Sequence, residues 1–343
     1  MKAPNLARLD EYPIVSIDVE TTGTYWYRDT LFGIAIAART DGGEIRSGYW
    51  DVRESPRILD ALRDKAPLLR RVVNHNMKFD ALFLDRLGVR FDPSALECTS
   101  VRAALINEHE PSFSLDSLSK KYIGREKVDD IYGELAAMFG GKPTRAAQIT
   151  NLHRAPVALA KRYAIVDPEL AILLWLWQEE EIQRQELQGV WALEKALMPV
   201  LIDLELGGVK VDTELAAHNL ESMDRRVEAA QAELNRLAGK DINPNSPPQM
   251  KAMFGVRKRE GTDLWETDSG IILPSTETGN ASIDADTLRS MQDKDPRARA
   301  AFMIRQLVKA KSFLKDHILG HEVNGYVYPN YNQTRGENDL GTG

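Results

Sequence analysis

The sequence predicts an α/β domain over residues 1–188, followed by a mainly α-helical domain over residues 189–343. Two observations support this division. A chain of 343 residues is long for one hydrophobic core. The pattern also changes near Gly189, from short strands alternating with helices to longer amphipathic helices. The composition, 43% hydrophobic and 28% charged, is typical of an ordinary globular protein.

Cysteine content and charge exclude some classes of protein. Cys98 is the only cysteine, so an internal disulfide framework is excluded and a reducing compartment is indicated. We see no signal peptide and no apolar run long enough to span a membrane, so we expect a cytoplasmic protein without membrane contact. A net charge of −7 argues against a protein that coats duplex DNA, which would usually be basic, but it does not exclude a nuclease, because bound metal ions can carry the positive charge.

Three strands are predicted close together at the start of the chain, over Tyr12–Glu20, Leu31–Ala38 and Glu44–Asp51. Their proximity in sequence indicates an antiparallel meander. In the first strand, a period of two places Asp18 and Glu20 on one face and the apolar residues on the other.

Asp18 and Glu20 predict half of a metal site. Two neighbouring carboxylates repel each other and lose hydration on a central strand, and a cation between them removes this cost. Oxygen ligands on a rigid strand suit Mg²⁺ or Mn²⁺ better than Zn²⁺. Later segments must then supply the remaining ligands.

A strand-to-helix junction follows. Arg57–Leu69 has helical apolar spacing, Val72–Asn76 is a short strand, and Met77–Leu87 is the next helix. Asp80 lies in the first helical turn, where the positive end of the helix dipole alone would favour an acid. His75 is interpreted as a polar loop residue rather than a ligand.

Arg154–Gln188 is predicted as one or two helices. Tyr163 and Asp167 are four residues apart and share a helix face. Because Pro168 disfavours helix at the residue before it, Asp167 lies at a helix break or in the first turn of a new helix. Alone, this pair would have a structural interpretation.

Taken together, three segments resemble the proofreading 3′→5′ exonucleases that carry a tyrosine in their last motif. They are Asp18-Val19-Glu20-Thr21-Thr22, Asn76-Met77-Lys78-Phe79-Asp80 and Tyr163-Ala164-Ile165-Val166-Asp167, with the Ser114–Leu118 helix between the last two. The resemblance covers roughly residues 10–188, and its strength comes from the order and spacing of the set.

This resemblance implies a ribonuclease-H-like fold, with a mixed five-stranded sheet flanked by helices. It also implies two Mg²⁺ ions, for which Mn²⁺ substitutes. Asp18, Glu20 and Asp167 would hold one ion, while Asp18 would bridge to a second, on which Asp80 acts mostly through water. Tyr163 would orient the attacking water, and Thr21, Asn76 and Phe79 would contact the terminal nucleotide.

The second half resembles the start of the polymerase domain of family A DNA polymerases, from bacteria and phages. The stretches that carry this resemblance are 205–209, 243–249, 276–282, and 305–313 leading to 331–334. They would build a helical thumb that grips duplex DNA, with Lys309, Lys311 and Ser312 as candidate phosphate contacts. Gly255–Gly279 is interpreted as loop-rich, and Thr213–Ala238 as a long helix.

The family's palm and fingers lie beyond residue 343, so this chain is not expected to polymerise DNA unaided. It could be a fragment or one part of a split polymerase that joins a second chain. We expect the segment after His321 to lack strand partners and to be poorly ordered.

The favoured hypothesis is therefore a metal-dependent exonuclease that takes a single-stranded 3′ end of DNA. Two alternatives remain: a non-catalytic nucleic-acid-binding module, and an RNA-processing exonuclease. The helical second half favours DNA over RNA.

Overall fold

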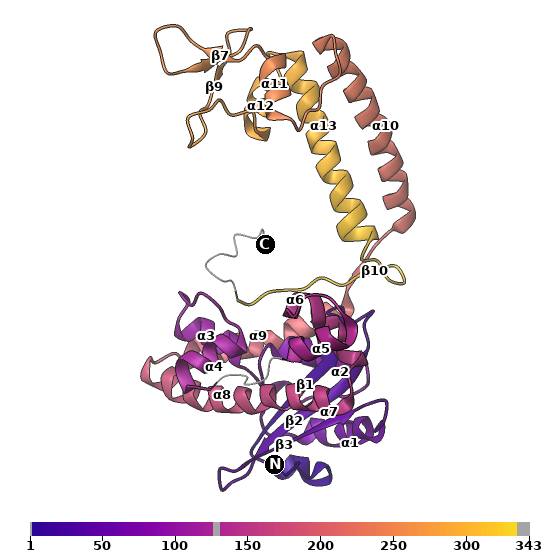
Figure 1. Cartoon of the computed structure of the whole chain (residues 1–343), viewed down its shortest axis with the longest axis vertical. Coiled ribbons are helices and arrows are strands. Elements are labelled where there is room, and N and C mark those ends of the chain that lie inside the picture. The colour runs from indigo at the N-terminus through magenta and orange to yellow at the C-terminus, as the bar shows by residue number, and fades with distance from the viewer. Residues whose placement is uncertain (1, 126–130, 335–343) are drawn as a thin grey trace. The chain divides into compact units, whose positions relative to one another are not determined.

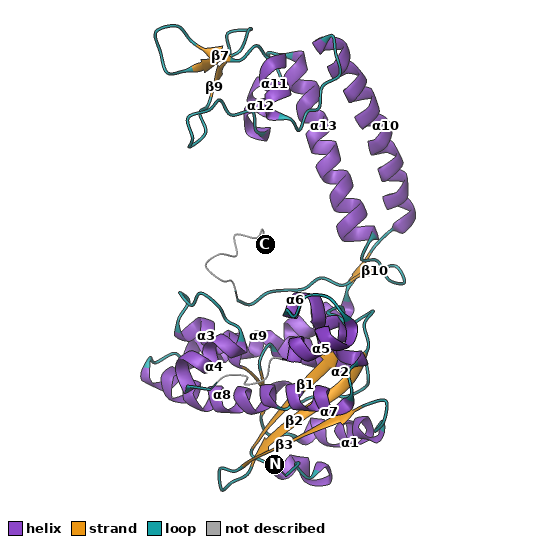
Figure 2. Ribbon diagram, in the orientation of Figure 1, coloured by secondary structure: helices purple, strands orange, loops and turns teal. Residues whose placement is uncertain are grey.

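The computed structural model describes residues 2–125 and 131–334, which form two compact units (Figures 1 and 2). The first unit runs to Gly208 and includes the segment from Tyr328 onward, and the second unit is Val209–Val327. The compact units therefore divide at Gly208, later than the change of pattern at residue 188, because helix α9 (Gln188–Gly207) packs on the first core.

A mixed five-stranded sheet forms the centre of the first unit, as predicted. Its strands are β1 (Ile14–Thr21), β2 (Leu31–Arg39), β3 (Ile45–Asp51), β4 (Val72–Asn74) and β5 (Leu96–Cys98). The strand order is β3-β2-β1-β4-β5. β1, β2 and β3 form the expected antiparallel meander, whereas β4 pairs parallel with both β1 and β5. β1 is thus the central strand.

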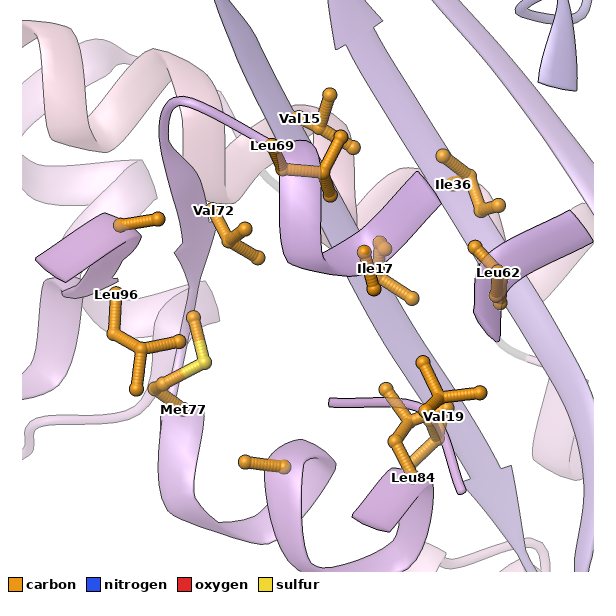
Figure 3. Close-up of a cluster of buried hydrophobic side chains, with 14 of the residues drawn as sticks. Val15, Ile17, Val19, Ile36, Leu62, Leu69, Val72, Met77, Leu84 and Leu96 are labelled. Atoms are coloured by element: carbon orange, nitrogen blue, oxygen red, sulfur yellow. The ribbon is translucent and has the colours of Figure 1, made fainter. Parts of the chain in front are cut away.

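Helices cover the sheet. They are α1 (Arg57–Lys65), α2 (Met77–Asp85), α3 (Thr99–Ile106), α4 (Leu115–Ile123), α5 (Ile131–Phe139), α6 (Arg145–Gln148), α7 (Val157–Ala164), α8 (Val166–Arg184) and α9. Ile17 and Val19 of β1 are buried with Leu62 of α1 and Leu84 of α2 (Figure 3). Because successive side chains of a strand alternate in direction, this burial turns Asp18 and its neighbour Glu20 to the opposite face.

The second unit is mainly helical. The long helices α10 (Thr213–Ala238) and α13 (Pro296–Ser312) pack side by side (Figure 2). They share a core with α11 (Pro247–Met253) and α12 (Ala285–Met291), in which Phe254 and Leu288 are fully buried. Among the described residues, none of the helices combines the length and apolar character needed to cross a bilayer.

The loop-rich interpretation of Gly255–Gly279 was incomplete. This stretch holds three two-residue strands, β7 (Arg257–Lys258), β8 (Trp265–Glu266) and β9 (Ile272–Leu273), paired as a small antiparallel sheet. Elements of two residues are too short for a period of two to be visible in the sequence.

The expectation that the segment after His321 lacks strand partners was wrong. β10 (Tyr326–Val327) pairs antiparallel with β6 (Val209–Lys210), so the two ends of the second unit meet. Residues 328–334, here called the return segment, belong to the first unit. There the Tyr331 N–H donates to Glu205 Oε1 over 2.8 Å. Residues 335–343 lie outside the described part of the chain.

Candidate active site: a cleft lined by carboxylates

A cleft of about 530 Å³ in the first unit collects side chains from three distant parts of the sequence. Seven of the predicted site residues line it: Asp18, Glu20, Thr21, Phe79, Asp80, Tyr163 and Asp167. They come from β1, α2, α7 and α8. The structure therefore places all four predicted carboxylates and the phenol along one surface, while Asn76 lines an adjoining pocket that Phe79 also borders.

β1 positions the first two acids. Asp18 is half-buried and Glu20 is 8% exposed, and the two lie on the face opposite the core residues. The pairing of β1 with β2 is regular up to Glu20 and shifts register between Glu20 and Thr21. Such irregularities end a strand ladder and redirect the side chains that follow, and they are frequent beside active sites.

A buried amide ties the second motif to β1. Asn74, which is 1% exposed, accepts a hydrogen bond from the Ile17 N–H over 2.9 Å and donates one to the Ile17 carbonyl. Asn74 Nδ2 also donates to Asp80 Oδ2 over 2.9 Å, and the Val19 N–H donates to Asp80 Oδ1 over 3.1 Å. Asp80 is thus an acid in the first turn of α2, as the helix dipole alone would favour. Its carboxylate is also hydrogen-bonded to the backbone of β1.

The surroundings of Asp80 disfavour its ionised form. Burial raises the pKa of Asp80 to about 8, the hydrogen bonds from Val19 and Asn74 oppose this rise, and the charge of Asp167 adds to it. A carboxyl in this position gains from a nearby cation.

Asp167 lies at the helix break that the sequence indicates. α7 ends at Ala164 and α8 begins at Val166, so Asp167 and Pro168 fall in the first turn of α8. Tyr163, in the last turn of α7, is 7% exposed. Burial raises the pKa of Tyr163 above its ordinary value, and the charges of Glu20 and Asp167 add to the rise. The side chain therefore stays a protonated phenol, suited to hydrogen bonding rather than to proton abstraction.

The cleft is also lined by residues that the sequence did not single out as site residues, and Arg145, Thr150 and His75 are among them. Arg145 of α6 brings a cation to it, and Thr150 brings a hydroxyl. His75 also borders the cleft, and its ring bridges Thr99 Oγ1 (2.8 Å) and the Phe113 carbonyl (2.9 Å). No local pattern marks Arg145. Asn74 could have been noticed in the sequence, because it is a polar residue at the end of the otherwise apolar strand Val72–Asn74.

The cleft fits a hard divalent cation in its chemistry. Its candidate ligands are all carboxylate oxygens, the donor type that Mg²⁺ and Mn²⁺ prefer. The pKa of Asp80 is raised mainly by burial and further by the charge of Asp167, and a bound cation would favour the ionised carboxylate. Within the described ranges, no three acidic, histidine or cysteine side chains converge into a ready cage for an ion.

The predicted phosphate contacts of the second half lie in the second unit, near the end of α13. Lys309 is exposed. Lys311 forms an ion pair with Asp224 of α10, and Ser312 Oγ donates to Asp316 Oδ2 over 2.7 Å. Lys311 and Ser312 are therefore already engaged within the unit.

The fold and the cleft together define a ribonuclease-H-like nuclease domain that is followed by a helical domain. A family model described as 3′-5′ exonuclease matches residues 5–178, about half of the chain, and the chain belongs to this family. The resemblance seen in the three motifs is confirmed.

Curated relatives extend the likeness over both units. The chain is 47% identical over 340 residues to the DNA polymerase DpoZ of Salmonella phage PMBT28, covering 98% of this chain and 53% of that protein. It is 43% identical to the DNA polymerase DpoZ of Vibrio phage phiVC8, covering 98% and 54%. The chain thus spans about half the length of these relatives.

A solved structure supports the fold of both units. The POL domain of Pol1 from M. smegmatis, in complex with DNA primer-template and dNTP, matches 97% of this chain and 52% of its own, with a TM-score of 0.70. The sequence identity is 20%, so this likeness concerns the fold alone.

Proposed function

We propose that the chain removes nucleotides from single-stranded 3′ ends of DNA with divalent metal ions, as the proofreading part of a family A polymerase. Residues 1–188 form the exonuclease domain in this proposal, and residues 189–343 begin the polymerase domain. The observation that carries the proposal is the single cleft lined by Asp18, Glu20, Asp80, Tyr163 and Asp167. The names of the phage relatives support DNA as substrate and the host cytoplasm as location.

The residues take distinct roles in this proposal. Asp18, Glu20 and Asp167 would hold one Mg²⁺, and Asp18 together with Asp80 would serve a second. When bound, two such ions lower the pKa of a water and neutralise the leaving oxygen. Tyr163 donates a hydrogen bond that orients the water, which agrees with the raised pKa of its phenol.

The substrate contacts follow from position. Thr21 and Phe79 line the cleft, and Asn76 lines the pocket beside it. A flat phenyl ring such as that of Phe79 packs on an unstacked base or sugar, which favours a frayed single strand over a duplex.

The test compares Asp18→Ala with wild type on a 3′-labelled single strand. We expect Mg²⁺-dependent release of mononucleotides by wild type, and a loss of more than ~100-fold in Asp18→Ala, or roughly 2.7 kcal/mol of transition-state stabilisation. Asp64→Ala, an exposed acid of α1, is the matched control and should keep wild-type activity. A folded Asp18→Ala protein with wild-type activity would refute the proposal. Equal or better cleavage of RNA would favour the RNA-processing alternative.

For duplex DNA, the exposed Lys309 is the strongest of the three predicted phosphate contacts, since Lys311 already has an ionic partner. Lys309→Gln should weaken duplex binding to the same extent for all sequences. The slope of log K against log salt concentration should fall by about one unit, because one fewer counterion is released on binding. Unchanged binding at low and high salt would remove Lys309 from the DNA-binding surface.

The exposed face of α9 favours a second proposal. Five apolar side chains recur at helical spacing on the side of α9 away from its buried residues: Val190 (39% exposed), Leu193 (67%), Leu197 (38%), Val200 (51%) and Leu204 (51%). An exposed stripe of this kind marks an interaction surface. The return segment contacts the same helix, through Tyr331 at Glu205 and through Gln333 at Glu194.

We propose that the stripe packs against a palm-and-fingers part of a family A polymerase, either in the same polypeptide or as a second chain. The test uses the part of the Salmonella phage relative that this chain does not match, produced separately and mixed with this chain. We expect a complex in size-exclusion chromatography that Leu193→Glu abolishes and that Glu214→Lys, an exposed change on α10, leaves intact. Absence of any complex with the wild-type chain would contradict the proposal.

A further inference from the structure

A second pocket adjoins the cleft. It has a volume of about 350 Å³ and lies within the first unit, between the loop after β1, the start of α2 and the return segment. Thr24, Tyr25 and Phe79 line both this pocket and the cleft, so the two lie side by side. A nucleotide strand that ends in the cleft passes close to the pocket at these three residues.

Aromatic rings form one wall of this pocket. Tyr25, Trp26 and Tyr27 follow one another in the loop, and Tyr328 reaches them from the return segment. The Tyr328 ring stacks on Tyr27 with centroids 4.8 Å apart, and meets Trp26 edge-on at 4.9 Å. Tyr25, 43% exposed, stands at the junction with the cleft. These contacts hold the rings in place before a ligand binds. A ligand that stacks on them therefore does not have to pay the entropy of ordering these side chains.

The charge of the pocket indicates whether it would bind the phosphate or the base of a nucleotide. Lys78 is the one cation among the described lining residues, and it is paired with Glu205 and also donates to the Tyr331 carbonyl. The pair is buried, with the two side chains 11% and 3% exposed. Because Glu205 neutralises Lys78, the pocket offers no net positive charge to attract a phosphate. A neutral nucleobase needs no such charge and loses little hydration when it enters the pocket.

Amide groups complete the lining. Asn76, Asn330 and Asn332 each border the pocket, and each side-chain amide carries both donors and acceptors. Asn76 has a left-handed backbone (φ 62°, ψ 52°) directly before α2, a conformation that asparagine tolerates better than most residues. Amides beside stacked aromatic rings are the groups that recognise the edge and face of an unpaired base.

We propose that this pocket binds a nucleobase of the single strand whose 3′ end occupies the cleft, at the second or third position from that end. The inference rests on the proposed exonuclease function and adds to it a base-binding site built from the Tyr25–Tyr27 loop and the return segment. It assigns to Tyr25 and Tyr328 a role in holding the strand, with no part in the hydrolytic step.

The experiment measures equilibrium binding without turnover. A 5′-labelled oligothymidylate is titrated with the full chain in EDTA, and fluorescence anisotropy gives Kd. A second set of oligonucleotides carries one abasic site at each of the first five positions from the 3′ end. Because stacking on an aromatic side chain contributes about 5- to 100-fold in affinity, an abasic site at position two or three should weaken wild-type binding by that factor.

Protein variants complete a double-mutant cycle. Tyr25→Ala and Tyr328→Ala should weaken binding of the intact strand about 5- to 100-fold and should erase the abasic penalty. Tyr25→Phe keeps the ring and should behave as wild type. Tyr331→Ala is the matched control, since this return-segment tyrosine is absent from the pocket lining and contacts Glu205 through its backbone.

The outcomes separate this inference from the proposed function. If wild type shows no position-dependent abasic penalty, or if both alanine variants retain it, the base-binding pocket is refuted even when the exonuclease is active. If wild type shows the penalty but releases no nucleotide with Mg²⁺, the pocket stands and the hydrolytic function fails.

Discussion

Asn74 completes the ladder between β1 and β4. The two strands pair through Val15 and Val72, and beyond that point the Asn74 side chain takes the place of a neighbouring peptide. Its oxygen accepts from the Ile17 N–H and its nitrogen donates to the Ile17 carbonyl, as a backbone amide would. The same nitrogen also holds Asp80. One buried side chain therefore supports both the central strand and the second motif.

Asn74→Asp changes this arrangement with almost no change in shape. The carboxylate keeps the acceptor but loses both donors, and leaving the buried Ile17 carbonyl unsatisfied costs about 1–3 kcal/mol. Two ionised carboxylates about 3 Å apart repel by roughly 5 kcal/mol at an effective dielectric constant of 20. One of the pair therefore takes up a proton, and its pKa in the folded state is raised. We expect a loss of about 3–5 kcal/mol of unfolding free energy at pH 8.

The sign of the pH dependence follows from that proton. An acid whose pKa is raised by folding binds its proton more tightly in the folded state, so the folded state loses stability as pH rises from about 4 to 8. The cost of Asn74→Asp should therefore be smaller at pH 5 than at pH 8. Urea unfolding followed by tryptophan fluorescence measures this difference in unfolding free energy. The signal reports mainly on the first unit, which contains five of the six tryptophans: Trp26, Trp50, Trp175, Trp177 and Trp191.

Asn5→Asp is the control. Asn5 is exposed and its side chain accepts a hydrogen bond from the Ala7 N–H, a role that aspartate fills equally well, so its unfolding midpoint should not move. If Asn74→Asp unfolds at the wild-type urea concentration at pH 8, or if its cost is the same at pH 5, the account of the Asn74–Asp80 contact is wrong.

Three further predictions test other contacts. Lys78→Met leaves the buried Glu205 carboxylate without its cation and should cost about 3–5 kcal/mol in urea unfolding; a cost below about 1 kcal/mol would show that the pair contributes little. Gly33→Ala places a methyl group against the Tyr49 ring across the strands and should cost about 1–3 kcal/mol, whereas Gly189→Ala on α9 meets open space and should be neutral or stabilising; equal effects would contradict the packing. Arg53 lowers the pKa of the buried Asp51 carboxylate, so this contribution is present above about pH 4 and is lost as pH falls; Arg53→Gln should shift acid unfolding to higher pH, and an unchanged acid midpoint would count against it.

The sequence predicted the parts of the site that depend on local periodicity. The alternation in β1 separates Asp18 from the core residue Ile17, and this follows from a period of two alone. Pro168 placed the start of α8 within a residue or two, because proline restricts the residue before it. The joining of the three motifs in one cleft could be inferred only from the resemblance to exonucleases, since no local pattern brings Asp80 to β1.

Tertiary contacts with no repeating pattern account for what was missed. Arg145 reaches the cleft from a four-residue helix, too short to show an amphipathic period. The return segment has no strand or helix signal, yet Tyr328 and Tyr331 hold it within the first unit through a ring stack and two hydrogen bonds of the Tyr331 backbone. Contacts of this kind depend on which surfaces the fold brings together, and a single sequence does not encode that locally.

The position of Lys78 links these observations. It lies between Asn76 and Asp80 in the second motif, and its ammonium group joins α2 to Glu205 of α9 and to the Tyr331 carbonyl of the return segment. A lysine contacting a phosphate would need its charge free, and here a buried carboxylate neutralises it. Lys78 therefore acts as a positioning residue: it sets the orientation of the helix that carries Asp80, and it connects that helix to the segment through which the chain returns from the second unit.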